Sequence, residues 1–302
     1  MDNLKRDILK LKQEKKALIL AHNYQLPEVQ DVADFVGDSL GLSIAASQTE
    51  AKIIVFCGVF FMAETAKILS PQKVVLLPDK EAGCPMADMI TAPQLRELKR
   101  LHPQAVSLCY VNTSAAVKAE CDYCCTSANA VKIVGESLKS VAEIIFVPDQ
   151  HLARYVASQT GRDFIIWPGY CPVHVDITPE HIEEAKKHYP QALVLVHPEC
   201  CQEVIALADH VLSTEGMCQY VKNSPVSTFI VGTEVGILHR LKKENPAKHF
   251  YPVSENAVCA DMKKITLEKI VLSLERMEYQ IELPEEIIPK AQKSIRRMLQ
   301  ST

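Results

Sequence analysis

This sequence lacks long hydrophobic runs, an excess of positive charge and a glycine-rich nucleotide loop. Its longer apolar runs, such as Ile53 to Met62, fall far short of the ~20 residues that a membrane-spanning helix needs. The formal net charge is −4 and the basic residues are dispersed, so nothing favours a nucleic-acid partner. We therefore expect no membrane, no nucleic acid and no nucleotide cofactor among the partners.

An apolar signal core is also absent, because Met1 to Arg6 is charged and leads into a helical pattern. This predicts a cytoplasmic protein, in which thiols stay reduced. The 11 cysteines are then poor candidates for a disulfide framework and instead indicate a metal or cluster site. With 302 residues, 48 % of them apolar, the chain is long enough for two or three compact units with extensive cores.

The sequence does contain an internal repeat of 87 or 88 residues. Four landmarks recur at this period: an apolar strand starting at Ala17, Ala105 and Ala192, a hydroxyl residue opening a helix at Ser39, Ser127 and Thr214, a threonine before a helix at Thr91, Thr178 and Thr266, and a cysteine at Cys84, Cys171 and Cys259. Each unit alternates helices with short, continuously apolar strands, as in parallel sheets that are covered on both faces. Four landmarks at one period indicate a triplicated unit.

We therefore predict an α/β fold of three homologous three-layer αβα domains with parallel sheets, related by a pseudo-threefold axis. The predicted domains are 1–87, 88–174 and 175–283, and no low-complexity linker separates them. A further amphipathic helix in 284–302 is expected to pack back on one of them. Three strands are expected in each unit, at 17–22, 52–57 and 73–77 in the first and at 143–147, 163–167, 228–231 and 249–253 for the later strands of the other two.

Polar residues end the first strand of each unit, where parallel sheets bind their ligands. The matching pairs are His22 and Tyr24, Tyr110 and Asn112, and His197 and Glu199. Any one of these alone is most simply a satisfied core residue, but six in register predict one central site. The three helix starts at Ser39, Ser127 and Thr214 offer free N–H groups, which favours a small substrate with several negative groups.

Only Cys84, Cys171 and Cys259 recur in all three units, and symmetry would bring them together on the axis. Three thiolates match three corners of an iron–sulfur cubane and leave the fourth iron open as a Lewis acid. The remaining cysteines lack this threefold recurrence. Among them, Cys121, Cys124 and Cys125 lack a second pair at zinc-ribbon spacing, and Cys200 and Cys201 are candidates for lining the site without binding metal.

Several longer stretches of the chain resemble the quinolinate synthase family. They are Ala21-His-Asn-Tyr-Gln-Leu-Pro-Glu-Val-Gln-Asp31, Gly37-Asp-Ser39, Gly83-Cys-Pro-Met86, Tyr110-Val-Asn-Thr-Ser114, Cys125-Thr-Ser-Ala-Asn129, Cys171-Pro-Val-His174, Val196-His-Pro-Glu-Cys200, Gly232-Thr-Glu-Val-Gly236 and Asn256-Ala-Val-Cys-Ala-Asp-Met-Lys263. The last stretch resembles the shorter form of the family, with a single cysteine, Cys259, at the last ligand position. The resemblance implies three αβα domains around one [4Fe–4S] cluster bound by Cys84, Cys171 and Cys259.

The resemblance also implies an activity: a non-redox condensation of iminoaspartate with dihydroxyacetone phosphate to quinolinate, coupled to an aspartate oxidase or dehydrogenase, in NAD biosynthesis. It implies that the catalytic residues are Tyr24, Tyr110, His197 and Glu199. The substrate-binding set that it implies is His22, Ser39, Tyr110, Val111, Asn112, Ser127, His197, Pro198, Glu199 and Thr214.

Three other classes stay open at this point. A zinc lyase or hydrolase would use the three cysteines and a bound water on a small anionic metabolite. An electron carrier would use the cluster, but such proteins usually close all four iron positions with protein ligands. A small-molecule binding protein would not need three cysteines on the pseudo-threefold axis. The metal content of the purified protein distinguishes the zinc enzyme from the cluster enzyme.

Overall fold

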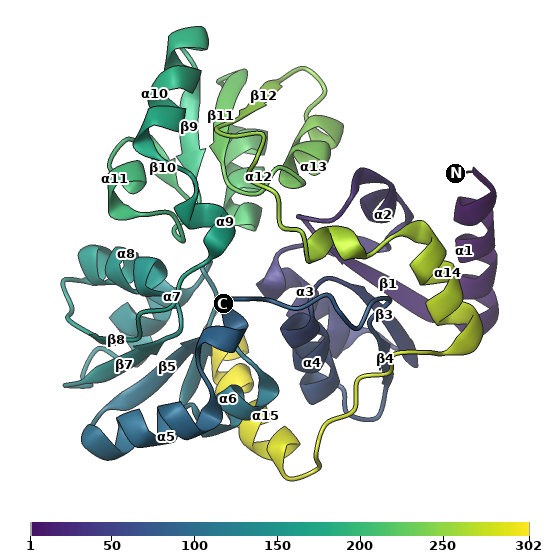
Figure 1. Cartoon of the computed structure of the whole chain (residues 1–302), viewed down its shortest axis with the longest axis horizontal. Coiled ribbons are helices and arrows are strands. Elements are labelled where there is room, and N and C mark those ends of the chain that lie inside the picture. Colours follow the sequence, from purple (N-terminus) through teal and green to yellow (C-terminus); the bar gives the residue numbers. More distant parts are fainter. Residues whose placement is uncertain (1, 302) are drawn as a thin grey trace.

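The computed structural model describes residues 2–301 and contains three separate four-stranded sheets. The strands are β1 (Ala17–His22), β2 (Phe35–Gly37), β3 (Ile53–Cys57) and β4 (Val74–Leu76) in the first sheet, β5 (Val106–Tyr110), β6 (Tyr123–Cys125), β7 (Ile144–Val147) and β8 (Ile165–Ile166) in the second, and β9 (Leu193–Val196), β10 (His210–Val211), β11 (Thr228–Gly232) and β12 (His249–Pro252) in the third. Figure 1 shows these sheets in three lobes around a common centre.

The three sheets share one topology. Their orders are β2-β1-β3-β4, β6-β5-β7-β8 and β10-β9-β11-β12, and every pairing is parallel. The predicted α/β class with parallel sheets in three repeated units is therefore confirmed. In each sheet the strand order reverses between the first and third strands in sequence, so a crevice lies at their carboxyl ends.

Burial explains why the central strands are continuously apolar. All four residues of β7 and all but the first of β3 are buried, because helices cover both faces of each sheet. The helices are α1 (Asp2–Lys15), α2 (Pro27–Val32), α3 (Ser39–Gln48), α4 (Phe60–Leu69), α5 (Ala92–Leu101), α6 (Ala115–Glu120), α7 (Ala130–Lys132), α8 (Gln150–Thr160), α9 (Pro172–Val175), α10 (Pro179–His188), α11 (Gln202–Ile205), α12 (Thr214–Asn223), α13 (Ile237–Glu244), α14 (Leu267–Arg276) and α15 (Ile287–Gln300).

Threonine N-caps mark a helix that follows the last strand of each sheet. Thr91, Thr178 and Thr266 are the N-caps of α5, α10 and α14, as predicted. In sequence α14 closes the range 175–283, but it packs against α1, beside the first sheet (Figure 1). The first lobe is thus completed by a helix from the far end of the chain.

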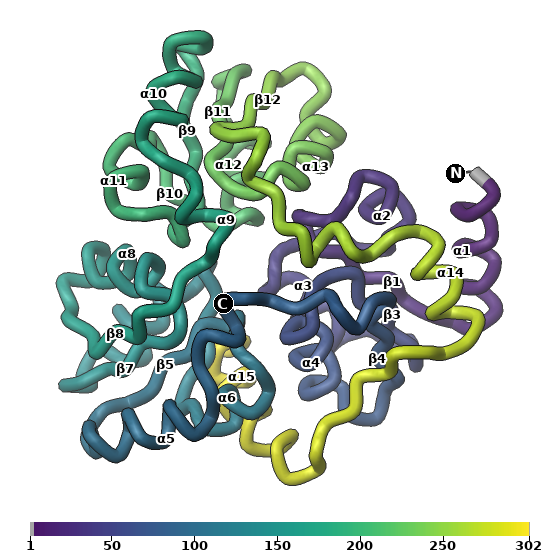
Figure 2. The backbone as a smooth tube through the Cα atoms, viewed as in Figure 1, coloured from purple at the N-terminus to yellow at the C-terminus, as the bar shows by residue number. Residues whose placement is uncertain are grey.

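The last helix, α15, also returns to another part of the molecule. It packs on α6 and β6 of the second lobe, where the Ser294 hydroxyl donates to the Lys118 carbonyl at 2.9 Å. Arg297 Nη1 donates to the Asp122 carbonyl at 2.6 Å in the same lobe. The tube in Figure 2 shows this tail crossing from the first lobe to the second. Both helices at the end of the chain therefore tie lobes together.

Two details differ from the sequence prediction. The sheets have four strands and not three, because β2, β6 and β10 are edge strands of only two or three residues and leave little apolar signal. Ser127 opens no helix. Asn129 Oδ1 accepts the Thr126 N–H at 2.8 Å, and this local turn delays the helix start to Ala130. Ser39 and Thr214 do begin helices, although their N-caps are Asp38 and Ser213.

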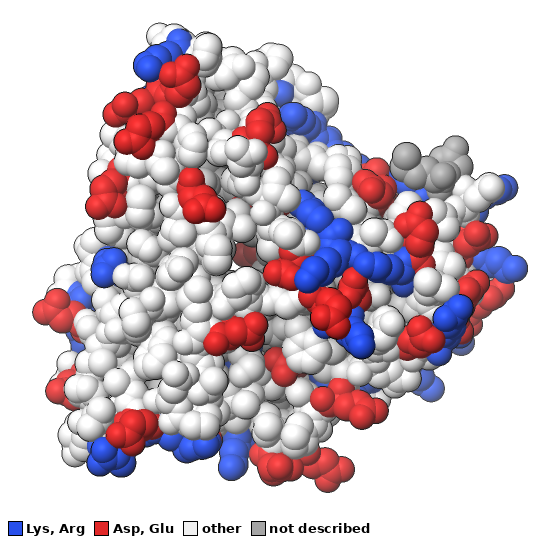
Figure 3. Space-filling view, in the orientation of Figure 1, with Lys and Arg blue, Asp and Glu red and all other residues white. Residues whose placement is uncertain are grey.

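Charged side chains of both signs lie on the surface of the molecule. Figure 3 shows acidic and basic side chains side by side at the right of one face and along its edge, whereas a wide area at the left centre carries few of them. Within residues 2–301, no helix combines the length and the apolar character of a membrane span.

Candidate active site

A cavity of about 310 Å³ lies between the three lobes. Twelve of the residues predicted from the sequence line it: His22, Tyr24, Ser39, Cys84, Tyr110, Asn112, Ser127, Cys171, His197, Glu199, Thr214 and Cys259. Each lobe contributes its strand-end residues and one of the three repeated cysteines. Val111 and Pro198, the other two predicted substrate residues, are not among the residues that line the cavity.

Glu199 lies at the centre of the polar residues. Its Oε1 accepts the Tyr110 hydroxyl at 2.5 Å, and its Oε2 lies 2.8 Å from His174 Nδ1. His197 Nδ1 lies 3.9 Å from the same oxygen, and His197 Nε2 lies 3.2 Å from the Ser127 hydroxyl. Residues from two sheets thus converge on one carboxylate.

The surroundings fix the protonation of these groups. Burial by itself would raise the pKa of Glu199, but the adjacent His174 and the hydrogen bond from Tyr110 hold that pKa well below its usual range. Burial lowers the pKa of His22 and of His197 to about 3, so both imidazoles are neutral. Burial and the Glu199 charge raise the pKa of Tyr24 and Tyr110 well above the ordinary value. Glu199 is therefore an ionised carboxylate beside the neutral imidazoles of His22 and His197 and the neutral phenols of Tyr24 and Tyr110.

A second chain of hydrogen bonds starts at Tyr24. Its hydroxyl lies 2.5 Å from Thr233 Oγ1, and Thr233 Oγ1 lies 2.8 Å from His174 Nε2. Because His174 Nδ1 contacts Glu199, the chain runs unbroken from Tyr24 to Tyr110 across the cavity. It joins residues of all three lobes.

Sequence reasoning missed His174 and Thr233. It considered the ends of the first strands, three helix starts and the repeated cysteines, whereas Thr233 follows the central strand β11 of the third sheet. His174 lies three residues after Cys171 on the short helix α9, on the same face of one helical turn. The signal was present in the stretches Cys171–His174 and Gly232–Gly236, since both contain polar residues after a strand end.

The three repeated cysteines reach the cavity on the loops after β4, β8 and β12. All three are partly buried thiols, and no disulfide forms among the cysteines. Burial raises the pKa of Cys84 to about 12, and the nearby Cys259 adds to this effect. Among the described residues only one trio of metal-binding side chains has donor atoms within 4.8 Å of one another, and it is not these three thiols. One tetrahedral zinc with Zn–S bonds of ~2.3 Å needs sulfurs ~3.8 Å apart, whereas these three sulfurs are not all within 4.8 Å of one another.

The other cysteines lie outside the cavity. Cys109 and Cys124 are fully buried on neighbouring strands, with their sulfurs 3.2 Å apart. Cys200 and Cys201 do not line the cavity, although the sequence made them candidates for this. Cys109 and Cys124 therefore belong to the core of the second lobe and not to the cavity.

Two buried networks support the lining residues. The Glu234 carboxylate accepts the Cys259 N–H at 3.1 Å and pairs with Lys263 Nζ at 2.7 Å, and Lys263 also donates to the Tyr24 carbonyl. Asn23, fully buried, donates from Nδ2 to Thr214 Oγ1 at 2.9 Å. The networks therefore join the first and third lobes at the cavity wall.

Comparisons with known proteins agree with this geometry. The family model described as "Quinolinate synthetase A protein" matches residues 6–300. A protein named quinolinate synthase from Dehalococcoides mccartyi (strain CBDB1) is 59 % identical over 292 residues, which cover 97 % of this chain and 96 % of the relative.

Two more distant relatives extend the match. The quinolinate synthase of Desulforudis audaxviator is 55 % identical over 298 residues, with 99 % and 98 % coverage. Quinolinate synthase 1 of Methanosarcina acetivorans is 51 % identical over 298 residues, with 99 % and 97 % coverage. On full-length matches of this strength, the chain belongs to the quinolinate synthetase A protein family.

Proposed function

We propose that the chain condenses iminoaspartate with dihydroxyacetone phosphate to quinolinate and releases phosphate and water, in de novo NAD biosynthesis. In this proposal it is a cytoplasmic, non-redox transferase, and an aspartate oxidase or dehydrogenase supplies its iminoaspartate. The observation that carries the proposal is the cavity itself, in which one thiol from each lobe faces the polar residues of all three strand ends.

The residues present fit a [4Fe–4S] cluster as cofactor. Cys84, Cys171 and Cys259 would hold it, since they share one cavity and are spaced too widely for a single zinc. When bound through three thiolates, such a cluster supplies a Lewis acid at its open iron. The zinc lyase or hydrolase with three cysteine ligands is disfavoured by the same spacing.

Neutral donors would bind the anionic substrate groups. None of the described side chains that line the cavity belongs to a lysine or arginine. The hydroxyls of Ser39, Ser127 and Thr214 line it instead, with the N-termini of α3 and α12 behind two of them. The Asn112 Oδ1 atom is buried and has no partner among the described residues, so it is available to accept a hydrogen bond from a substrate N–H or O–H.

Glu199 and Tyr24 are the proposed proton-transfer groups. Glu199 stays ionised and can accept a proton from a substrate carbon or nitrogen, while Tyr24 keeps its proton and can give it to a leaving hydroxyl. The Tyr24–Thr233–His174–Glu199 chain connects the two groups, so a proton taken at one end can be returned at the other. Tyr110 would keep the carboxylate oriented, and His197 would orient the Ser127 hydroxyl, which lies 3.2 Å from its Nε2.

An anaerobic assay tests the proposal. Purified chain is given dihydroxyacetone phosphate and iminoaspartate, which an aspartate oxidase generates in place, and quinolinate and phosphate are quantified. We expect equal amounts of both products from the wild type and none from Cys171→Ala. A colourless but active Cys171→Ala variant would refute the ligand assignment.

A further inference from the structure

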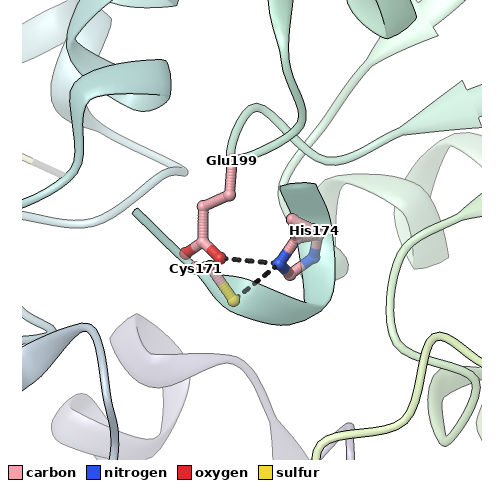
Figure 4. Close-up of side chains that lie close together, drawn as sticks. All are labelled: Cys171, His174 and Glu199. Atoms are coloured by element: carbon pink, nitrogen blue, oxygen red, sulfur yellow. Dashed lines mark hydrogen bonds and ion pairs between the residues drawn. The ribbon is translucent and has the colours of Figure 1, made fainter. Parts of the chain in front are cut away.

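We propose that the cluster-free chain holds one Zn²⁺ ion on Cys171, His174 and Glu199, a mononuclear site distinct from the set of three cysteines. Figure 4 shows Cys171 and His174 on the turn of α9 and Glu199 reaching the same point from a separate loop. His174 Nδ1 lies 3.1 Å from the Cys171 sulfur and 2.8 Å from Glu199 Oε2. Sulfur, nitrogen and oxygen donors of this kind are the ligands that zinc prefers.

The spacing of the donors is close to that of a zinc site. Bond lengths of ~2.3 Å to sulfur and ~2.0 Å to nitrogen and oxygen put tetrahedral ligand atoms ~3.3 to 3.6 Å apart. Each contact therefore has to open by only about half an ångström. All three donor atoms already lie within 4.8 Å of one another, unlike the sulfurs of Cys84, Cys171 and Cys259.

Two further hydrogen bonds already orient these ligands. His174 Nε2 lies 2.8 Å from Thr233 Oγ1, so the imidazole can donate there and leave Nδ1 free to bind metal. The Tyr110 hydroxyl donates to the Glu199 oxygen that faces away from His174, at 2.5 Å. A second layer of partners of this kind is typical of protein zinc sites.

Charge and access also favour the ion. One thiolate and one carboxylate neutralise Zn²⁺, so a neutral unit forms in a buried wall. The Cys171 thiol gives its proton to solvent as the Zn–S bond forms. All three residues line the cavity, which leaves room for water as the fourth ligand.

The consequence concerns cluster assembly and rests on the proposed function. Cys171 belongs to both sets, so a chain loaded with zinc cannot complete the three-thiolate set. Zinc then acts as a competitor of the cluster, and a preparation exposed to zinc is trapped in an inactive form.

Metal titration of the full-length, cluster-free chain tests the site. The chain is stripped with chelator under argon and titrated with Zn²⁺, and in parallel with Co²⁺, whose thiolate charge-transfer band reports sulfur ligation. We expect about one ion per chain and a cobalt spectrum with a single thiolate. No stoichiometric binding of either ion overturns the proposal.

Variants separate the two sets of ligands. Cys84→Ala/Cys259→Ala should bind zinc as the wild type does, and so should the matched control Cys201→Ser, a partly buried thiol outside the cavity. His174→Asn and Glu199→Gln should each weaken binding more than about a hundredfold, and Thr233→Val about tenfold, since loss of an orienting partner costs about 10–100-fold. Circular dichroism and thermal melting of the metal-free variants check that each is folded.

Two results contradict the proposal in this series. Zinc binding that disappears in Cys84→Ala/Cys259→Ala places the ion on the three cysteines. Binding that is unchanged in both His174→Asn and Glu199→Gln places it elsewhere. Activity distinguishes this inference from the proposed function: a chain that assembles its cluster and makes quinolinate, but binds no zinc when cluster-free, leaves the function standing and refutes only the zinc site.

Discussion

Replacing Lys263 by methionine should destabilise the chain by about 2 to 3 kcal/mol and lower its cluster content. Lys263 Nζ lies 2.7 Å from Glu234 Oε1, and the Glu234 side chain is 1 % exposed. The same oxygen accepts the N–H of Cys259, and the other accepts the N–H of Gly236 at 2.7 Å. Without the ammonium group, a buried carboxylate keeps only two backbone donors.

The magnitude follows from burial. Removing one partner of a fully buried ion pair costs about 3–5 kcal/mol, because the other charge stays buried and unpaired. Lys263 keeps 19 % of its side-chain surface exposed, so water partly replaces it and the cost falls below that range. Glu234→Gln should cost about 1–3 kcal/mol, since either orientation of the amide points its NH₂ at a donor. The double variant should cost about 1–2 kcal/mol less than the sum of the two.

Equilibrium unfolding in urea of the metal-free chain measures these costs, and iron content after reconstitution measures the effect on Cys259. Lys243→Met is the matched control, because the Lys243–Asp31 pair also spans two lobes at 2.7 Å but Lys243 is 61 % exposed. That variant should change the free energy of unfolding by less than about 0.5 kcal/mol. If the costs of Lys263→Met and Glu234→Gln are strictly additive and both variants keep their full iron content, Lys263 and Glu234 do not act as a pair that supports Cys259.

Three further predictions concern the cavity. Tyr24→Phe should lower turnover strongly while the cluster absorbance stays intact, and loss of the absorbance would make Tyr24 a structural residue. Asn23→Ala should raise the KM for the anionic substrate about tenfold with iron content unchanged, because Thr214 loses the buried donor at 2.9 Å that orients its hydroxyl; an unchanged KM contradicts this role. Acidification should destabilise the metal-free chain. Burial lowers the pKa of His22 and of His197 to about 3 in the folded chain, below the unfolded value of 6.5. The unfolded state therefore takes up more protons, and the free energy of unfolding falls as the pH drops from 6.5 toward 3. For each histidine, the free energy of unfolding changes by up to about 1.4 kcal/mol per pH unit. His197→Asn should remove the contribution of one histidine, which is measured by urea unfolding between about pH 7 and 5.

The repeat made most of the fold predictable from the sequence. The strand Ala17–His22 agrees with its predicted bounds, because a continuous apolar run between a charged helix and a polar loop has few other interpretations. The edge strands are different. Val211 and His210 form β10 only through pairing with β9, and a two-residue strand carries no periodicity of its own. The predicted helix start at Ser127 was wrong for a local reason. The Asn129 side chain accepts the Thr126 N–H, and this turn competes with the first turn of a helix.

The site was predictable where symmetry repeats a residue type and hidden where it does not. The three cysteines recur at one period, and the strand-end pairs share a register. Thr233 and His174 have no counterpart of the same type at the matching positions, so only the fold shows that they meet between Tyr24 and Glu199. Lys263 and Glu234 were also hidden, because their pairing depends on a loop that returns to the neighbouring lobe.

In the proposed function, each of the three lobes gives one thiolate to a single cluster. This arrangement is tested by measuring the iron and acid-labile sulfide content, with the visible spectrum, of wild-type chain purified without oxygen and kept free of zinc. We expect about four irons and four sulfides per chain, and neither in Cys84→Ala, Cys171→Ala or Cys259→Ala. A wild-type chain that makes quinolinate without iron, or that keeps its cluster in any of these variants, would contradict this arrangement.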